Sequence, residues 1–170
     1  MKILLDEQVP QPVLTPLNQM LPHHQIDHVQ TVGWKSKKDV QLLNDLAKRG
    51  YEVLVTADLN QLYKPEECRL IKKNGFHHVR FEQSGLGIAQ TASAIATVVA
   101  GLPVVLPILQ KATGQRLVLL KTVKCNGDAH EICDPDIDPP PYWPGRESAR
   151  GHTPTQRQRA SSSDVPPTVS

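Results

Sequence analysis

The sequence predicts an α/β fold in which the strands of a mostly parallel sheet alternate with helices along the chain. Short apolar runs without polar alternation, at 2–5 and 51–56, are typical of strands buried on both faces. Between them, apolar residues recur at helical spacing over 40–47, and Gly50 then ends the helix. Because this alternation continues to about Val123, we expect a three-layer α/β/α domain with about five strands.

The first helix and the second strand have weaker signals. Pro10 and Pro12 fit the opening turn of a helix over 10–21, although Pro16 makes that helix imperfect. The short run at 27–30 follows it and is expected to be the second strand.

The later elements follow from clearer patterns. The segment 36–39 matches a helix-start signal, so the second helix begins there. The β-branched residues of 51–56 make this run the clearest strand. The remaining predicted elements are helices over 63–74 and 88–100 and strands over 78–81 and 116–123.

The most apolar stretch of the chain, 88–109, is interrupted by Gly101, Pro103 and Pro107. We therefore expect a buried helix over 88–100 followed by a loop, and no membrane span. The chain does not open with the basic and apolar regions of a secretory signal, and its three cysteines have unrelated spacings. These features predict a cytoplasmic protein with reduced cysteines.

Composition changes sharply near residue 125. The segment 134–144 is dense in proline and acidic residues, and 146–170 is polar with almost nothing to bury. Such a segment cannot offset the entropy lost on ordering. We therefore expect one folded domain over 1–124 and a disordered tail over 125–170.

Acidic residues mark the ends of two predicted core strands. Asp6 follows the first run directly, Asp58 follows the run at 51–56, and Asp39 opens the helix between them. In an open parallel sheet, ligands bind in the crevice beyond the carboxyl ends of the strands. Acids gathered there repel one another unless a cation lies among them, and oxygen ligands favour Mg²⁺ or Mn²⁺.

Each acid also has a purely structural explanation. Asp6 could accept hydrogen bonds from the next turn, although the adjacent acid Glu7 has no such need. Asp58 could cap a following helix. Asp39 lies three residues after Ser36, where an acid complements the helix dipole. Local sequence alone does not decide between these explanations and a metal site.

The net charge of +2 argues little for a polyanionic partner, but basic residues gather locally. Lys35, Lys37 and Lys38 directly precede Asp39. They could form a solvated loop, or they could contact the phosphates of a nucleic acid beside the acids.

Three spaced segments resemble the bacterial PIN-like family, a compact branch of the PIN-domain nucleases that include many toxins of toxin–antitoxin pairs. They read KILLDEQVP over 2–10, VGW with DVxLL over 32–43, and VLVTAD over 53–58. The resemblance implies a ribonuclease that depends on Mg²⁺ or Mn²⁺, with Asp6, Asp39 and Asp58 as metal ligands. It also implies an RNA substrate and admits an antitoxin protein and a second copy of the chain as partners.

One departure concerns the loop after the third motif. The family often has a second acid and an aromatic residue there, in a Thr-x-Asp-x-Asp-Phe pattern, whereas this chain has Asn60 and Gln61. The amide oxygen of Asn60 could still bind a metal, but the lost charge predicts weaker affinity. Glu7 is a candidate outer group that orients the water used in hydrolysis.

Two other functions remain open. A receiver-like phosphoacceptor would also use acids after its first and third strands and a lysine after its fifth, here Lys121, but it gives Asp39 no role. A non-catalytic PIN-like binding module would use the altered loop and the tail to bind a partner protein, and would bind no metal.

Overall fold

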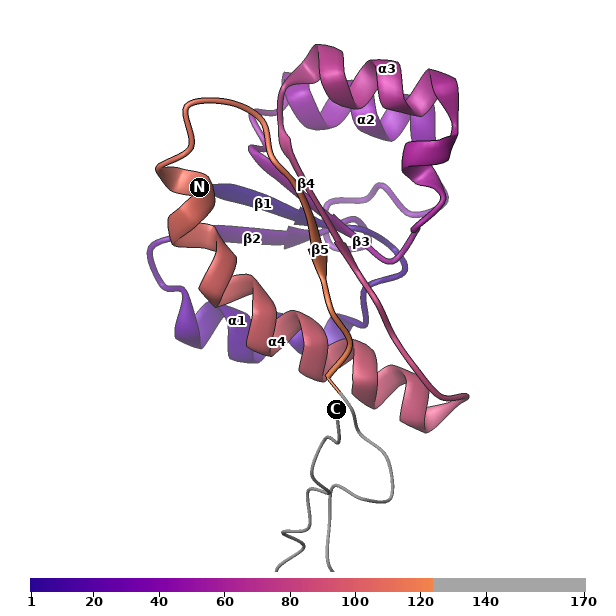
Figure 1. Cartoon of the computed structure of the whole chain (residues 1–170), viewed down its shortest axis with the longest axis vertical. Helices are drawn as coiled ribbons and strands as arrows, with labels where there is room; N and C mark the ends of the chain where they lie inside the picture. The colour runs from indigo at the N-terminus through magenta and orange to yellow at the C-terminus, as the bar shows by residue number, and fades with distance from the viewer. Residues whose placement is uncertain (124–170) are drawn as a thin grey trace, which may run out of the picture. The chain divides into compact units, whose positions relative to one another are not determined.

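A computed structural model describes residues 1–123, which contain one sheet of five parallel strands in the order β2-β1-β3-β4-β5 (Figure 1). The strands are β1 (Lys2–Leu5), β2 (Gln25–His28), β3 (Val53–Thr56), β4 (His77–Phe81) and β5 (Leu117–Leu120). The helices are α1 (Leu14–Met20), α2 (Asp39–Lys48), α3 (Pro65–Asn74) and α4 (Ile88–Gln110), with short 3-10 helices η1 (Gln11–Val13) and η2 (Gln61–Tyr63). The predicted α/β fold with a five-stranded parallel sheet is confirmed.

The order of the strands reverses beside β1. The chain runs from β1 to β2 on one side, then crosses to β3 on the other side and continues outward to β4 and β5. Leu5 of β1 pairs with Val55 of β3, so Asp6 and Thr56 are neighbours at the carboxyl ends of the two strands. This reversal is the point at which open α/β sheets bind their ligands.

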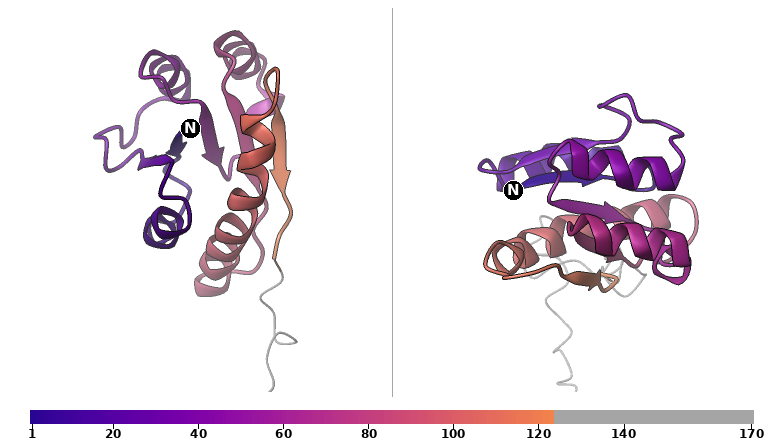
Figure 2. Two further views of the ribbon diagram at one scale, coloured as in Figure 1. Left: turned by 90° about the vertical axis from the view of Figure 1, so that its left-hand side faces the viewer. Right: turned by 90° about the horizontal axis from the view of Figure 1, so that it is seen from above.

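Helices cover both faces of the sheet (Figure 2). Each face has its own hydrophobic core. Alternate strand residues point to opposite faces, so Ile3 and Leu5 pack with α1 and α4, whereas Leu4 packs with α2 and α3. Strand residues are apolar on both sides because both sides are covered, which explains the uninterrupted apolar runs in the sequence.

Helix α4 corrects one sequence-based prediction. The helix was expected to end near residue 100, yet it continues to Gln110 through Pro103 and Pro107. Its buried residues continue along the same helix to Leu106, after Pro103, and to Leu109, after Pro107. The free energy of packing this face against the sheet exceeds the cost of the backbone hydrogen bonds that the prolines remove.

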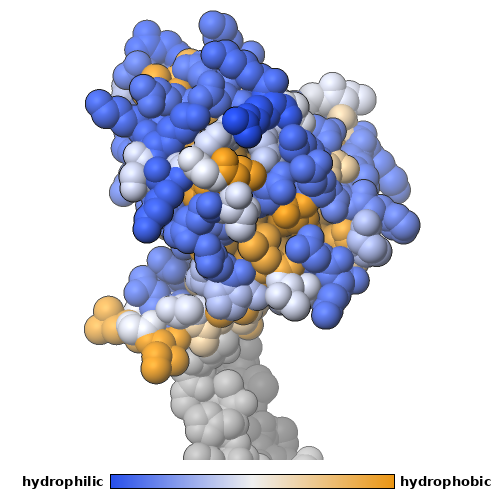
Figure 3. Space-filling model, turned by 180° about the vertical axis from the view of Figure 1, so that it is seen from behind, coloured by the Kyte–Doolittle hydropathy of each residue, from blue (hydrophilic) through white to orange (hydrophobic). Residues whose placement is uncertain are grey.

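The outer surface of α4 differs from that of the other helices. The region around α2 and α3 is largely hydrophilic in Figure 3, whereas the approach to α4 exposes Leu86 and Ile88. Within residues 1–123, α4 alone is long and apolar enough to cross a membrane, with a mean hydropathy of 2.2 over 18 residues. Core helices of globular proteins are also long and apolar, and one face of α4 packs against the sheet and α1. Length and hydropathy are therefore weak evidence that α4 crosses a membrane.

One predicted strand has different bounds in the structure, and the predicted tail lies beyond the residues that the structure describes. Strand β2 begins at Gln25, two residues before the predicted 27–30, because Gln25 pairs with Lys2 at the start of β1. The domain boundary at 124 and the tail expected over 125–170 lie outside the described residues.

A buried histidine lies on β4, in register with Leu54 of β3. His78 on β4 is fully buried, and its Nε2 lies 2.7 Å from Oε1 of Gln61, a residue of η2 that is itself buried. Burial lowers the pKa of His78 to about 4, and the positive charge of Arg80 contributes to the shift. The neutral ring therefore fixes η2, and with it the loop that follows β3.

We expect His78 to make folding stability depend on pH. The unfolded chain binds a proton near the ordinary value of 6.5, whereas the folded protein resists it down to about 4, so stability is lost as pH falls between these values. The loss attributable to His78 is roughly 3 kcal/mol. Urea unfolding at pH 7 and pH 4.5 should show a smaller loss for His78→Gln than for the wild type. An exposed control, His23→Gln, should behave as the wild type does. Equal losses in all three proteins would contradict the assignment.

Candidate metal centre

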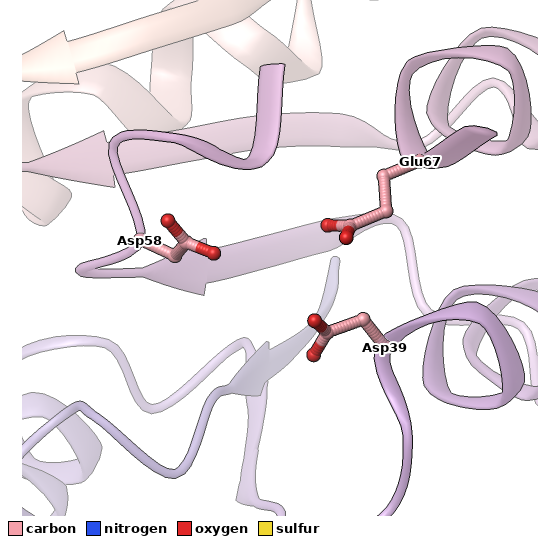
Figure 4. A group of neighbouring side chains, drawn as sticks. All are labelled: Asp39, Asp58 and Glu67. Carbon is pink, nitrogen blue, oxygen red and sulfur yellow. The ribbon is translucent and has the colours of Figure 1, made fainter. Parts of the chain in front are cut away.

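Three carboxylates from three separate elements point toward one another (Figure 4). Asp39 is the first residue of α2, Asp58 lies in the loop after β3, and Glu67 lies in the first turn of α3. One oxygen from each lies within 4.8 Å of the others. The structure thus brings together two acids predicted from the sequence, Asp39 and Asp58, and adds Glu67, which was not predicted.

The two carboxylate oxygens of Asp58 make different contacts: one holds the local turn, and the other faces the acid group. Oδ1 accepts a hydrogen bond of 2.8 Å from the backbone N–H of Asn60 and so holds the turn into η2. Oδ2 is 3.3 Å from the ammonium of Lys64. Asp58 does not cap η2, whose N-cap is Asn60 without a side-chain cap hydrogen bond, but it holds the turn before η2 while its other oxygen faces the acid group.

The ammonium of Lys64 contacts all three acids. Its Nζ lies 3.0 Å from Glu67 Oε1, 3.3 Å from Asp58 Oδ2 and 3.6 Å from Asp39 Oδ2. The hydrogen bonds to Glu67 and Asp58 raise the pKa of Lys64 above its ordinary value, so the side chain is charged. A positive charge thus already lies where the three carboxylates converge.

Glu67 is the most enclosed member of the group. Its residue is only 6% exposed, and Oε2 is buried without a hydrogen-bond partner among residues 1–123. A buried carboxylate oxygen without a partner is costly, and a metal ion would satisfy it. Hard oxygen donors of this kind fit Mg²⁺ or Mn²⁺.

A sequence signal for Glu67 does exist, but it is ambiguous. Glu66 and Glu67 occupy the first turn of α3, where any acid complements the helix dipole. Only the helical register separates them: Glu67 lies four residues before buried Ile71 and so faces inward, whereas Glu66 faces solvent.

Asp6 borders the group without belonging to the set of three. Its Oδ2 accepts a hydrogen bond of 2.8 Å from the Thr56 hydroxyl, and its Oδ1 accepts one of 2.7 Å from the N–H of Glu7. Burial is the main cause that raises the pKa of Asp6, and the charges of Asp39 and Glu7 raise it further. Thr56 Oγ1 also accepts a hydrogen bond of 3.0 Å from the N–H of Asp58. One hydroxyl therefore links two of the predicted acids.

The other predicted site residues lie around this centre. Glu7 is exposed and its Oε2 accepts a hydrogen bond of 3.2 Å from the N–H of Ser36, so it joins the loop after β1 to the loop before α2. Asn60 is exposed and contributes its N–H to Asp58.

The three predicted RNA-binding lysines differ in what they contact. Lys35 and Lys38 are exposed. Lys37 instead lies 2.5 Å from Asp45 and 4.3 Å from the centre of the Trp34 ring. Of the three, Lys37 is the one engaged in contacts within the domain, which leaves Lys35 and Lys38 as the better candidates to meet a ligand.

We expect Thr56→Val, a change of nearly equal shape, to destabilise the protein by about 1 to 3 kcal/mol, because it removes the hydroxyl partner of a part-buried Asp6 oxygen and of the Asp58 N–H. Loss of the hydroxyl should also raise the pKa of Asp6 further. Urea unfolding and NMR titration of the carboxyl carbon measure the two effects. Thr113→Val, at an exposed position, is the control and should be nearly neutral. A Thr56→Val protein as stable as the wild type would contradict the proposed link.

Comparison with known proteins gives a family match for the part of the chain that carries these acids. Residues 1–83 match a family model described as a PIN like domain. No match was found among curated proteins or among solved structures. The matched segment extends from β1 through β4 and includes Asp6, Asp39, Asp58 and Glu67. The resemblance recognised in the sequence is confirmed over residues 1–83, the part of the chain that this PIN-like family model covers.

Proposed function

We propose that this domain is a ribonuclease that hydrolyses phosphodiester bonds with the help of Mg²⁺ or Mn²⁺. The observation that carries the proposal is the convergence of Asp39, Asp58 and Glu67, with a buried oxygen of Glu67 that has no hydrogen-bond partner within residues 1–123. The match of residues 1–83 to a PIN-like family model, which suggests the nuclease superfamily, supports it independently. Asp39, Asp58 and Glu67 would hold the metal, and Asp6 would act beside them.

Glu67 changes the expectation drawn from the altered loop. Where the family often has a second acid, this chain has the neutral Asn60, and weaker metal binding was expected for that reason. Glu67 reaches the same group of oxygens from α3 and supplies a third negative charge. We therefore propose that the site retains enough charge to bind a divalent ion, with Asn60 as an additional oxygen donor.

The roles of the remaining residues follow from their contacts. A bound divalent ion would supply positive charge to the phosphate and activate water for attack. Asp6, whose pKa is raised, is suited to hold a proton at Oδ1 or Oδ2 during the reaction. Thr56 orients the Asp6 carboxylate through its hydroxyl. Glu7 fixes the loop before α2 through Ser36, and so keeps Asp39 in place.

RNA would approach over the loop that leads into α2. Lys35 and Lys38 are exposed there and directly precede Asp39, so their ammonium groups can meet backbone phosphates beside the acids. Lys37 would contribute after leaving Asp45. A role as a cytoplasmic toxin that an antitoxin neutralises, with a homodimer as its assembled form, is the finer proposal that the family resemblance supports.

Two contacts favour a nuclease over a receiver-like phosphoacceptor. A receiver gives no role to Asp39, yet Asp39 lies in the acid group. A receiver also needs its fifth-strand lysine at the acids, whereas Lys121 lies 3.1 Å from Glu82. The binding module without metal remains the alternative, and the experiment below separates it from the nuclease.

The proposal predicts Mn²⁺-dependent cleavage of a mixed RNA pool by the full-length protein. Asp39→Asn, Asp58→Asn and Glu67→Gln should each lower the rate on the order of 100-fold, because each removes a charge that would hold the metal. Glu66→Gln is the matched control, since Glu66 is exposed and adjacent but outside the group. Full activity in all three variants would reject the assigned site. No cleavage by the wild type, together with no Mn²⁺ binding, would favour the binding module.

A further inference from the structure

Lys64 occupies the space between the three acids that would hold the proposed metal. Its ammonium lies within 3.6 Å of an oxygen of each of the three acids. Within residues 1–123, no other lysine or arginine comes within ion-pair distance of Asp39, Asp58 or Glu67. The three acids thus share one cation, and that cation belongs to the chain itself.

The charges explain why this contact forms. Three carboxylates held within 4.8 Å repel one another, and a single ammonium offsets only part of that repulsion. It leaves a formal charge of −2, the sum of three acids and one lysine, which a divalent ion would match. Lys64 is therefore sufficient to hold the acids together but is a weaker partner than a divalent metal.

The contact distances mean that Lys64 and a metal cannot share the same centre. Mg²⁺ binds oxygen at about 2.0 to 2.1 Å and attracts the same carboxylate oxygens that the ammonium contacts. An ammonium and a divalent ion a few ångströms apart would repel each other strongly. Entry of one therefore requires departure of the other.

The location of Lys64 allows such a departure at little cost to the fold. The residue precedes Pro65, the first residue of α3, and its side chain is 45% exposed. Its flexible four-carbon stem can carry the ammonium into solvent without moving the helix. Glu67, by contrast, is buried in the first turn of α3 and stays in place.

We propose that Lys64 is a resident counter-ion of the acid group, and that a divalent metal binds by displacing its ammonium from Asp39, Asp58 and Glu67. The inference rests on the proposed metal site. Lys64 acts as a positioning residue: it keeps the three carboxylates converged before the metal arrives and lowers the apparent affinity for the ion. The affinity of the site is thereby set partly by a side chain that does not bind metal.

The first test measures Mn²⁺ binding to the full-length protein by electron paramagnetic resonance of the free ion. Lys64→Gln should bind Mn²⁺ about tenfold more tightly than the wild type, because a competing charge is gone. The matched control is Lys72→Gln, which removes an equal charge from the exposed side of α3. Equal tightening in both variants, or no tightening in Lys64→Gln, would overturn the proposal while leaving the metal site intact.

A second measurement needs no substitution and remains informative if Lys64→Gln fails to fold. Acetylation of wild-type lysines by a water-soluble reagent is followed by mass spectrometry with and without Mn²⁺. Release from the acids should make Lys64 react several-fold faster when Mn²⁺ is added, while Lys72 stays unchanged. Binding of Mn²⁺ without faster labelling of Lys64 would overturn the proposed displacement of Lys64 and leave the proposed metal site standing. Absence of Mn²⁺ binding in the wild type and in Lys64→Gln would overturn both this inference and the proposed metal site.

Discussion

The parallel pairing of β1 with β3 is the constraint on which the rest of the site depends. It sets Asp6 beside Thr56, and the Thr56 hydroxyl then joins the Asp6 carboxylate to the N–H of Asp58. Because β2 and β3 run parallel and precede α2 and α3, both helices begin near the carboxyl end of the sheet. Their first turns deliver Asp39 and Glu67 to the loop that carries Asp58. Residues distant in sequence meet because the sheet positions the first turns of these helices and the loop after β3 at one edge.

The cost of gathering like charges is offset by different means at each acid. Asp6 stays close to the group through hydrogen bonds and a raised pKa. Asp58 divides its oxygens between its own turn and Lys64. Glu67 is buried, and one of its oxygens has no hydrogen-bond partner in the part of the chain that the structure describes, which leaves it available to a cation. The site is thus held together by the fold and by one ammonium.

Much of this arrangement could be predicted from the sequence because it depends on local patterns. Uninterrupted apolar runs indicated the buried strands, and Asp6 and Asp58 followed from their place at the strand ends. The end of α4 could not be predicted, since packing against the sheet outweighs the local effect of Pro103 and Pro107. Glu67 was missed for a similar reason: the helical register separates it from Glu66 only once the packing of α3 shows that Ile71 is buried.

The central claim is that three side chains from separate elements form one divalent-cation site. The most direct test is X-ray diffraction from crystals of the full-length protein soaked in Mn²⁺, with data collected for the anomalous signal of the metal. We predict an anomalous peak at about 2 Å from oxygens of Asp39, Asp58 and Glu67. A map without a peak among these carboxylates, from crystals in which Mn²⁺ binds elsewhere or not at all, would contradict the account.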